Sequence, residues 1–312
     1  MGAYPLALLW EVIDEYVFHE NFVTRNWQLA MYSQYSAMIE RAGGLVTDNR
    51  IVIVVESPGG VEETELYFEM PQPSPAFTTL EDAAAWMDFI IRDEMIGGDI
   101  FFIDFRSFVL GCHIDETAAR IEQAIENGVR KFIVDLRDNG GGFIIAGEQL
   151  LAAMGICAPW DGGIRRFNPL IINTLRESGR RLPLPFPLMR VLTLFADGIT
   201  NEPSTHSVNA NDVFVSILTN NFTFSAAIVM ASWVQDGGFG NIIGAPSGHA
   251  PSAFGGVLRF DLPYTRLQVS VSHSRFLRPD VNADQMILWP DIMVDPADAL
   301  EVAIEYLRGR NR

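Results

Sequence analysis

The sequence predicts an α/β fold in which buried strands alternate with helices along the chain. Ile100–Phe105 is a dense apolar strand, Ile114–Asn127 has the apolar spacing of an amphipathic helix, and Lys131–Leu136 is a second buried strand. The same order of strand and helix recurs with the strand Val213–Leu218 and the helix Ala226–Val234. A strand–helix–strand order favours parallel pairing of the strands, because parallel neighbours need a crossover connection. With 312 residues, 48% of them hydrophobic, the chain can bury the core of such a fold.

A small N-terminal region, residues 1–75, is expected to precede the core. Apolar residues recur at helical spacing in two segments, and a Pro-Gly-Gly turn separates two apolar runs in a third. Three prolines then mark a linker. The expected elements are helices at Leu6–His19 and Trp27–Ile39, a β-hairpin within Arg50–Met70, and the linker prolines Pro71, Pro73 and Pro75.

The larger part, residues 76–312, is expected to hold the α/β core. Residues 161–211 are rich in Arg, Pro and Asn, and we interpret them as an insertion that covers one side of this core. Such a segment could line a substrate groove or be a plain surface excursion. The remaining expected elements are helices at Thr79–Asp93, Ile145–Met154 and Ala297–Leu307, and strands at Asn241–Ile243, Val257–Phe260 and Leu267–Ser272.

The charge of the chain excludes two classes of partner. A formal net charge of −17 and a pI near 4.6 make nucleic acid and anionic membrane surfaces poor partners, because both require a positive face. The apolar start, Met1–Trp10, lacks a basic segment and a cleavage site, so no signal peptide is expected. The chain also has no long uncharged apolar run, and we expect no membrane span.

The cysteines and lysines limit the chemistry further. Cys112 and Cys157 are too few for a disulfide framework and lack the spacing of a zinc site, so we expect two buried thiols. No pattern in the sequence calls for a metal or a cofactor. Lys131 is the only lysine, so any lysine-dependent mechanism would have to use it.

A glycine-rich turn follows the strand that ends at Leu136. The segment Asp135–Gly142 reads D-L-R-D-N-G-G-G and leads into a helix, where glycines let backbone amides face an anion. It is not a dinucleotide motif, because the G-x-G-x-x-G spacing is absent, and no lysine follows the glycines as in a P-loop. By itself it indicates either an oxyanion hole or a structural turn.

Ser225 stands at a second junction of a strand with a helix. The segment Thr219–Ala227 reads T-N-N-F-T-F-S-A-A, which places the serine just before the helix. A serine there can present its hydroxyl beside helix amides, as a nucleophile requires. The alternative is an N-cap serine that only stabilises the helix.

The two segments together resemble the paired signature of peptidase family S41, D-L-R-x-N-x-G-G followed by T-x-S-A-A. The segment 242–251, I-I-G-A-P-S-G-H-A-P, is similar to the family's I-I-G-E-P-T-G-G-K-P. Leu262-Pro263 and the P-D-I element at residues 290–292 also match, so the resemblance covers about residues 97–307.

The resemblance implies a ClpP/crotonase-like core of stacked ββα units and a serine that attacks a peptide carbonyl. Ser225 would be the nucleophile, and Gly140, Gly141 and the Ala226 amide would hold the oxyanion. It further implies a peptide or protein substrate and an extracytoplasmic location. Many members also carry a PDZ module, for which the stretch Arg50–Met70 is too short.

The general base departs from the family pattern. Ala250 occupies the position where many members carry the lysine of a serine–lysine dyad, so that dyad is excluded. His249 is adjacent to the vacant position, and a neutral imidazole could accept the serine proton. Neighbours in an extended loop point to opposite sides, however, so the loop must twist for His249 to serve.

Three functions remain open on the sequence alone. The first is a serine peptidase with Ser225 and His249, and the second is a peptide-binding protein on the same fold that has lost its base. A crotonase-like acyl-CoA enzyme is a weaker third, since the acidic charge and the T-x-S-A-A serine argue against it.

Overall fold

The computed structural model describes residues 5–16, 21–33, 35–44, 46–48, 50–57, 60–67, 90–109, 111–159, 161–177, 185–194 and 198–310. The chain forms two compact units, Met1–Ala85 and Trp86–Arg312. The linker prolines lie outside the described residues. No helix among the described residues is long and apolar enough to cross a membrane.

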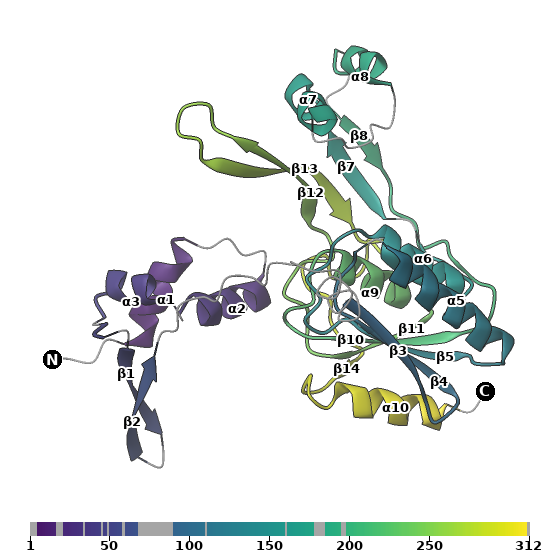
Figure 1. Cartoon of the computed structure of the whole chain (residues 1–312), viewed down its shortest axis with the longest axis horizontal. Helices are drawn as coiled ribbons and strands as arrows, with labels where there is room; N and C mark the ends of the chain where they lie inside the picture. Colours follow the sequence, from purple (N-terminus) through teal and green to yellow (C-terminus); the bar gives the residue numbers. More distant parts are fainter. Residues whose placement is uncertain are drawn as a thin grey trace. The chain divides into compact units, whose positions relative to one another are not determined.

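The described residues of the first unit form three short helices and a hairpin (Figure 1). The helices enclose a few buried apolar side chains, including Ile13 and Leu29, and Arg25 forms an ion pair with Asp14. The predicted hairpin is confirmed, with Arg50 opposite Tyr67. The bounds are α1 (Leu6–Asp14), α2 (Phe22–Tyr32), α3 (Ser36–Arg41), β1 (Arg50–Ser57) and β2 (Gly60–Tyr67).

A six-stranded sheet forms the centre of the second unit, in the order β14-β11-β10-β5-β4-β3. β3 is antiparallel to β4, and every other neighbouring pair is parallel, which confirms the pairing predicted from the strand–helix–strand order. The strands are β3 (Ile91–Ile96), β4 (Ile100–Phe105), β5 (Lys131–Asp135), β10 (Phe214–Thr219), β11 (Gly240–Gly244) and β14 (Ile292–Met293).

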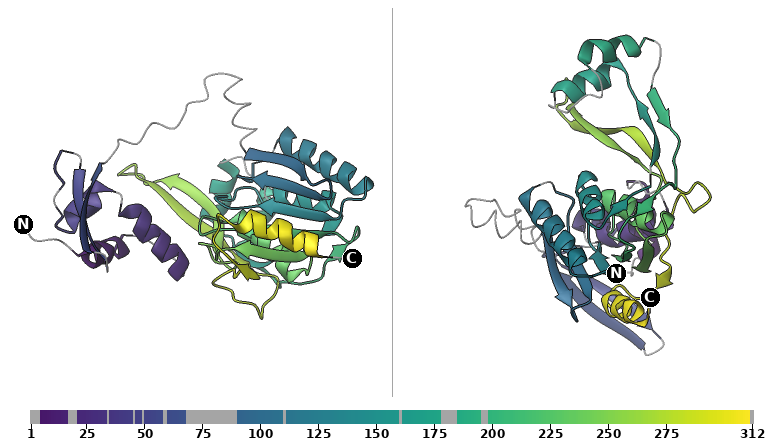
Figure 2. Two further views of the ribbon diagram at one scale, coloured as in Figure 1. Left: turned by 90° about the horizontal axis from the view of Figure 1, so that it is seen from below. Right: turned by 90° about the vertical axis from the view of Figure 1, so that its right-hand side faces the viewer.

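Helices cover both faces of this sheet, so its strands are buried on both sides (Figures 1 and 2). Phe132 and Val134 point into the larger cluster beneath α5, α6 and α9, whereas Ile133 points into a second cluster beneath α10. The predicted α/β fold is confirmed. The helices are α5 (Cys112–Glu126), α6 (Ile145–Ala153), α9 (Ala226–Asp236) and α10 (Ala299–Gly309).

A second, antiparallel sheet of order β12-β13-β7-β8 projects from the core (Figure 1). Two of its strands and two helices come from residues 161–211, and the helices bury the small apolar cluster of Phe167, Ile172 and Met189. The elements are β7 (Gly162–Arg166), α7 (Pro169–Glu177), α8 (Phe186–Leu192), β8 (Gly198–Asn201), β12 (Phe254–Asp261) and β13 (Gln268–Leu277). A separate antiparallel pair is formed by β6 (Ile156–Cys157) and β9 (Val208–Asn209).

Two expectations need correction. Residues 91–93 belong to strand β3, paired to β4, and not to the end of a helix; residues 79–89 of that expected helix lie outside the described residues. Cooperative pairing with the neighbouring strand outweighs the local helical spacing. Cys157 is an exposed free thiol, because it lies on the short edge pair β6–β9 and not in the core.

Candidate active site

Three neighbouring parallel strands carry the predicted site residues at one edge of the central sheet. β5 leads into the glycine turn, β10 leads into the loop that ends at Ser225, and β11 leads into the loop that contains His249. The register pairs β10 with β5 on one side and with β11 on the other. The carboxyl ends of parallel strands meet at the same edge, so the topology brings together segments up to about a hundred residues apart.

Ser225 has an unusual backbone conformation. It precedes α9 with φ of 54° and ψ of −124°, a region that non-glycine residues rarely occupy. Its side chain makes no capping hydrogen bond, so the N-cap alternative does not explain the serine. The residue is half-buried. A strained strand-to-helix turn that presents a serine hydroxyl is also the geometry of nucleophile elbows.

Gly141 lies against Ser225. A methyl group built on Gly141 would be 2.6 Å from the Ser225 Cβ and 2.8 Å from the Ala226 nitrogen. Gly141 also has φ of +87°, which favours glycine. The predicted proximity of the glycine turn to the serine is therefore present, and only a residue without a side chain fits at this contact.

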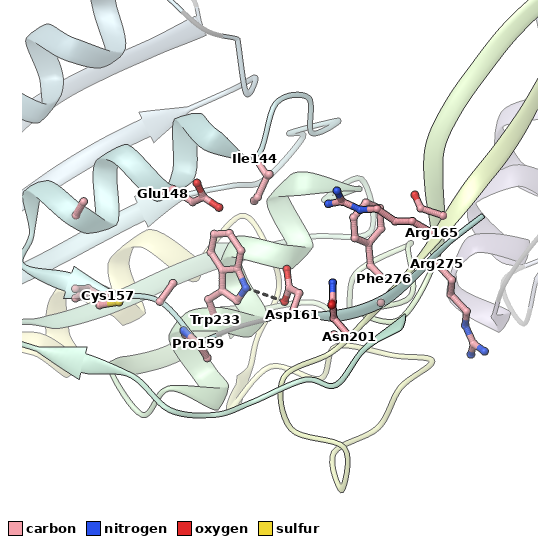
Figure 3. Close-up of a pocket in the computed structure, with 16 residues that line it drawn as sticks. Ile144, Glu148, Cys157, Pro159, Asp161, Arg165, Asn201, Trp233, Arg275 and Phe276 are labelled. Atoms are coloured by element: carbon pink, nitrogen blue, oxygen red, sulfur yellow. Dashed lines mark hydrogen bonds between the residues drawn. The ribbon is translucent and has the colours of Figure 1, made fainter. Parts of the chain in front are cut away.

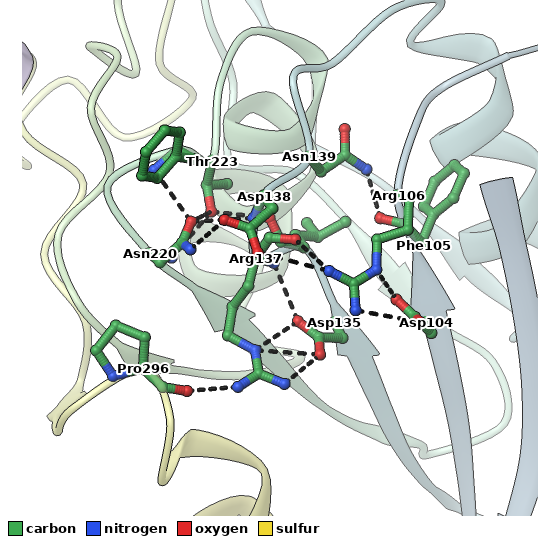
Figure 4. A network of polar contacts seen from close by, with 12 residues as sticks. Asp104, Phe105, Arg106, Asp135, Arg137, Asp138, Asn139, Asn220, Thr223 and Pro296 are labelled. Atoms are coloured by element: carbon green, nitrogen blue, oxygen red, sulfur yellow. Dashed lines mark hydrogen bonds and ion pairs between the residues drawn. The ribbon is translucent and has the colours of Figure 1, made fainter. Parts of the chain in front are cut away.

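Hydrogen bonds join the glycine turn to the serine loop (Figure 4). The Asn220 side chain accepts from the Asp138 amide at 3.0 Å and donates to the Asp138 carboxylate at 2.8 Å. Thr223 donates its hydroxyl proton to the Leu136 carbonyl at 2.8 Å, and the Phe224 amide donates to the Asn139 carbonyl at 2.9 Å. These bonds fix the two loops relative to each other.

Arginine side chains hold the outer side of the turn (Figure 4). Arg137 pairs with the buried Asp135 at 2.5 Å and also donates to the Pro296 carbonyl. The bonds to Asp135 raise the pKa of Arg137 further, so the guanidinium stays charged. Arg106 pairs with Asp104 at 2.5 Å, donates to the Arg137 carbonyl at 3.4 Å and lies 3.6 Å from the Asp138 carboxylate. The turn is thereby tied to the ends of both β4 and β5.

The backbone amides near Ser225 are not equivalent. The Gly141 amide donates to the side chain of Asn139 at 2.8 Å, so this predicted oxyanion donor is occupied. Among the described residues, the Gly140 and Ala226 amides find no hydrogen-bond partner. Ala226 opens α9, whose first amides lack helical acceptors and carry the positive end of the helix dipole. Gly140 and Ala226 are the available donors.

His249 lies next to Ser225. Its Nδ1 accepts a hydrogen bond from the Ser225 amide at 3.3 Å, and its ring contacts the Phe224 ring with centroids 4.0 Å apart. The His249 loop packs tightly against the serine loop, because a methyl group built on Gly248 would be 2.2 Å from the Asn221 carbonyl oxygen. Burial lowers the pKa of His249 to about 4, so the imidazole is neutral at pH 7.

The lysine positions agree with the exclusion of a serine–lysine dyad. Ala250 is buried and carries no base. Lys131 begins β5, at the end of the strand away from the glycine turn, and lies 3.4 Å from Asp99. Among the described residues, no group of three histidine, cysteine or acidic side chains could hold a metal ion.

Two asparagines at the site did not stand out in the sequence. Asn139 is fully buried and donates to the Phe105 carbonyl at 2.6 Å, and Asn220 links both loops. Their positions in the sequence could have indicated them, because Asn139 precedes Gly140 and Asn220 follows a buried strand. Asparagine side chains at such positions often bond to turn amides.

Several solved structures are similar to this chain. Mature CPAF is 14% identical over 88% of this chain and 70% of its own, with a TM-score of 0.50. The photosystem II D1 C-terminal processing protease is 16% identical with a TM-score of 0.44; the aligned region covers 80% of this chain and 56% of that protease. A lipoprotein from Streptococcus agalactiae is 13% identical over 100% of this chain and 98% of its own, with a TM-score of 0.45. At this identity, the likeness to mature CPAF concerns the fold alone.

The sequence comparison is more specific. No curated protein matches the chain. The model of peptidase family S41 matches residues 100–294, which include the glycine turn, Ser225 and His249. Because this match spans more than half of the chain, the chain belongs to peptidase family S41.

Proposed function

We propose that this protein is a serine peptidase in which Ser225 is the nucleophile. The observation that carries the proposal is the strained, uncapped serine at the start of α9, packed directly against Gly141. A serine that only capped the helix would bond to a helix amide in an ordinary conformation. Family membership supports a peptidase function, and these features favour Ser225 as its nucleophile.

In the proposed mechanism, the Ser225 Oγ attacks the carbonyl carbon of the scissile peptide bond while its proton passes to Nδ1 of His249. For this step the hydroxyl has to approach Nδ1, which accepts from the Ser225 amide in the resting structure. The Gly140 and Ala226 amides donate to the oxyanion. The imidazolium then returns the proton to the leaving nitrogen, the C–N bond breaks, and an acyl-serine remains. Water, activated by the same imidazole, hydrolyses that ester.

A second candidate is a peptide-binding protein that has lost catalysis. The observation in its favour is the state of His249, whose Nδ1 is already bonded to a backbone amide and whose pKa is lowered to about 4. Such an imidazole is a weak proton acceptor. This protein would bind peptides without cleaving them, and Ala250→Lys would restore some reactivity by supplying a base at the vacant position.

Cleavage of a mixed peptide library, read by mass spectrometry, tests the proposal. The parent should release fragments, Ser225→Ala should release none, and Ser270→Ala, which changes an exposed serine on β13, should match the parent. Equal cleavage by the parent and Ser225→Ala would remove Ser225 from the mechanism. Binding without cleavage by the parent would favour the second candidate.

A further inference from the structure

A pocket of about 370 Å³ lies beside α6, a few residues beyond the glycine turn (Figure 3). Its walls come from α6, the end of α9, β7 and β13. Its volume is in the range of sites that bind small molecules or single side chains. Trp233 lies two turns after Ser225 on α9, which corresponds to about 12 Å along the helix. A peptide held at Ser225 could therefore reach the pocket with a residue a few positions from the scissile bond.

One end of the pocket is acidic. The Asp161 carboxylate accepts a hydrogen bond from the Trp233 indole at 2.8 Å, and Glu148 from α6 reaches toward the same space (Figure 3). Burial, together with the nearby Glu148 and Asp236, raises the pKa of Asp161 to about 7, although the hydrogen bond from Trp233 lowers it. Asp236 is already paired with Arg278. Asp161 thus faces an indole and a second carboxylate, and neither neutralises its charge.

The walls of the pocket are aromatic and aliphatic. Trp233 and Phe276 line it together with Ile144 and Ile156. Two arginines also contribute: Arg275 lies over the Phe254 ring at 5.7 Å and points away from the pocket, while the guanidinium of Arg165 lies near Phe276 (Figure 3). The acidic end therefore remains open to a cation, and aromatic faces attract cations and pack against aliphatic stems.

We propose that this pocket binds the basic side chain, arginine or lysine, of a peptide substrate. The cationic group lies between Asp161 and Glu148, and its aliphatic stem packs against Trp233 and Phe276. An anionic group in the same place would be repelled by the two carboxylates. The identification of the ligand as a substrate rests on the proposed peptidase function; the preference for a cation does not.

Binding of a small probe tests the preference without requiring catalysis. The probe is N-acetyl-arginine methylamide, its neutral counterpart is N-acetyl-citrulline methylamide, and the protein is the full chain with Ser225→Ala. The readout is the Trp233 indole NMR signal, assigned with Trp233→Phe. We expect the arginine probe to shift this signal and to bind about tenfold or more tightly than the citrulline probe.

Two variants and a matched control sharpen this test. Glu148→Gln and Asp161→Asn should each weaken binding of the arginine probe by about tenfold, and Asp161→Asn keeps an acceptor for the indole. Glu122→Gln removes the same charge from an exposed position on α5 and should bind as the parent does. Equal binding of the two probes, or no shift of the Trp233 signal, would overturn the proposal.

Cleavage preferences separate this proposal from the peptidase function. If both hold, the parent cleaves peptides with arginine or lysine at one fixed distance from the scissile bond, and Glu148→Gln loses that preference while still cleaving. Cleavage with no basic preference and no probe binding would refute the pocket proposal and leave the peptidase. Probe binding without any cleavage would refute the peptidase and leave the cation site.

Discussion

The Ser225 amide donates a hydrogen bond to Nδ1 of His249 over 3.3 Å. Nδ1 therefore carries the lone pair, and the ring proton lies on Nε2 when the imidazole is neutral. The nitrogen that could accept a proton thus faces the backbone of the proposed nucleophile. This contact brings a histidine to Ser225 although the usual lysine position holds Ala250.

His249→Ala should reduce kcat/KM for peptide cleavage by at least about 100-fold, the usual lower range for losing a general base. His206→Ala, at an exposed histidine, is the matched control and should retain activity. Steady-state kinetics on one peptide would measure both. A His249→Ala variant as active as the parent would exclude the histidine as the base.

The pH dependence of cleavage should reflect the low pKa of His249. The base acts in its neutral form, so the rate should rise with pH through an acid limb near pH 4 and then level off. Circular dichroism at each pH would show that the limb is not unfolding. A midpoint near the ordinary histidine value of about 6.5 would contradict the burial of this imidazole.

Substitutions in the glycine turn should differ sharply between neighbours. Gly141→Ala places a methyl group 2.6 Å from the Ser225 Cβ at a positive φ, and should abolish cleavage and destabilise the fold by about 1 to 3 kcal/mol. Gly140→Ala meets nothing within 4 Å and should leave stability nearly unchanged. Thermal unfolding of the pair tests this. Equal stability of the two variants would mean that the turn does not pack against the serine.

Asp161 should make stability fall as pH rises. Its pKa is about 7 in the folded state and 3.8 ordinarily, so between these values the folded state binds more protons than the unfolded state. The difference corresponds to roughly 4 kcal/mol at about 1.4 kcal/mol per pKa unit. Asp161→Asn should therefore be more stable than the parent at about pH 8, and the gain should vanish near pH 4.

Denaturant unfolding of the parent and Asp161→Asn at the two pH values would measure this gain. His249 acts in the opposite direction, because its lowered pKa costs stability as pH falls from 6.5 toward 4; the comparison of variant with parent cancels this contribution. Asp261→Asn, at an exposed carboxylate, is the control. A gain that is the same at both pH values would show that Asp161 is charged throughout.

The sequence predicted the parts of the fold that local pattern determines. Ile100–Phe105 and Lys131–Leu136 are buried on both faces, and their continuous apolar runs are a strong signal for parallel strands. Strand β3 was missed because its charged residues, Arg92 and Glu94, suit an exposed helix, and only pairing with β4 makes it a strand. Short strands such as β6 likewise depend on distant partners.

The candidate site was predictable where a motif carried the chemistry. The glycine turn and Ser225 could be located because the residue types and their spacing are specific. The pocket lined by Asp161 and Trp233 could not, since these residues are 72 positions apart and meet only through packing of the second sheet on α9. The hydrogen bond from the Gly141 amide to the Asn139 side chain likewise depends on side-chain geometry, which the spacing of residues in the sequence does not reveal.

Labelling with a fluorophosphonate probe tests the central claim most directly, because the reagent requires an activated serine hydroxyl. After digestion, mass spectrometry locates the modified residue. We predict a single adduct on the peptide that contains Ser225, rapid in the parent, absent in Ser225→Ala and strongly slowed in His249→Ala. A parent that stays unlabelled, or that carries the adduct on another serine, would contradict the assignment of Ser225 as the nucleophile.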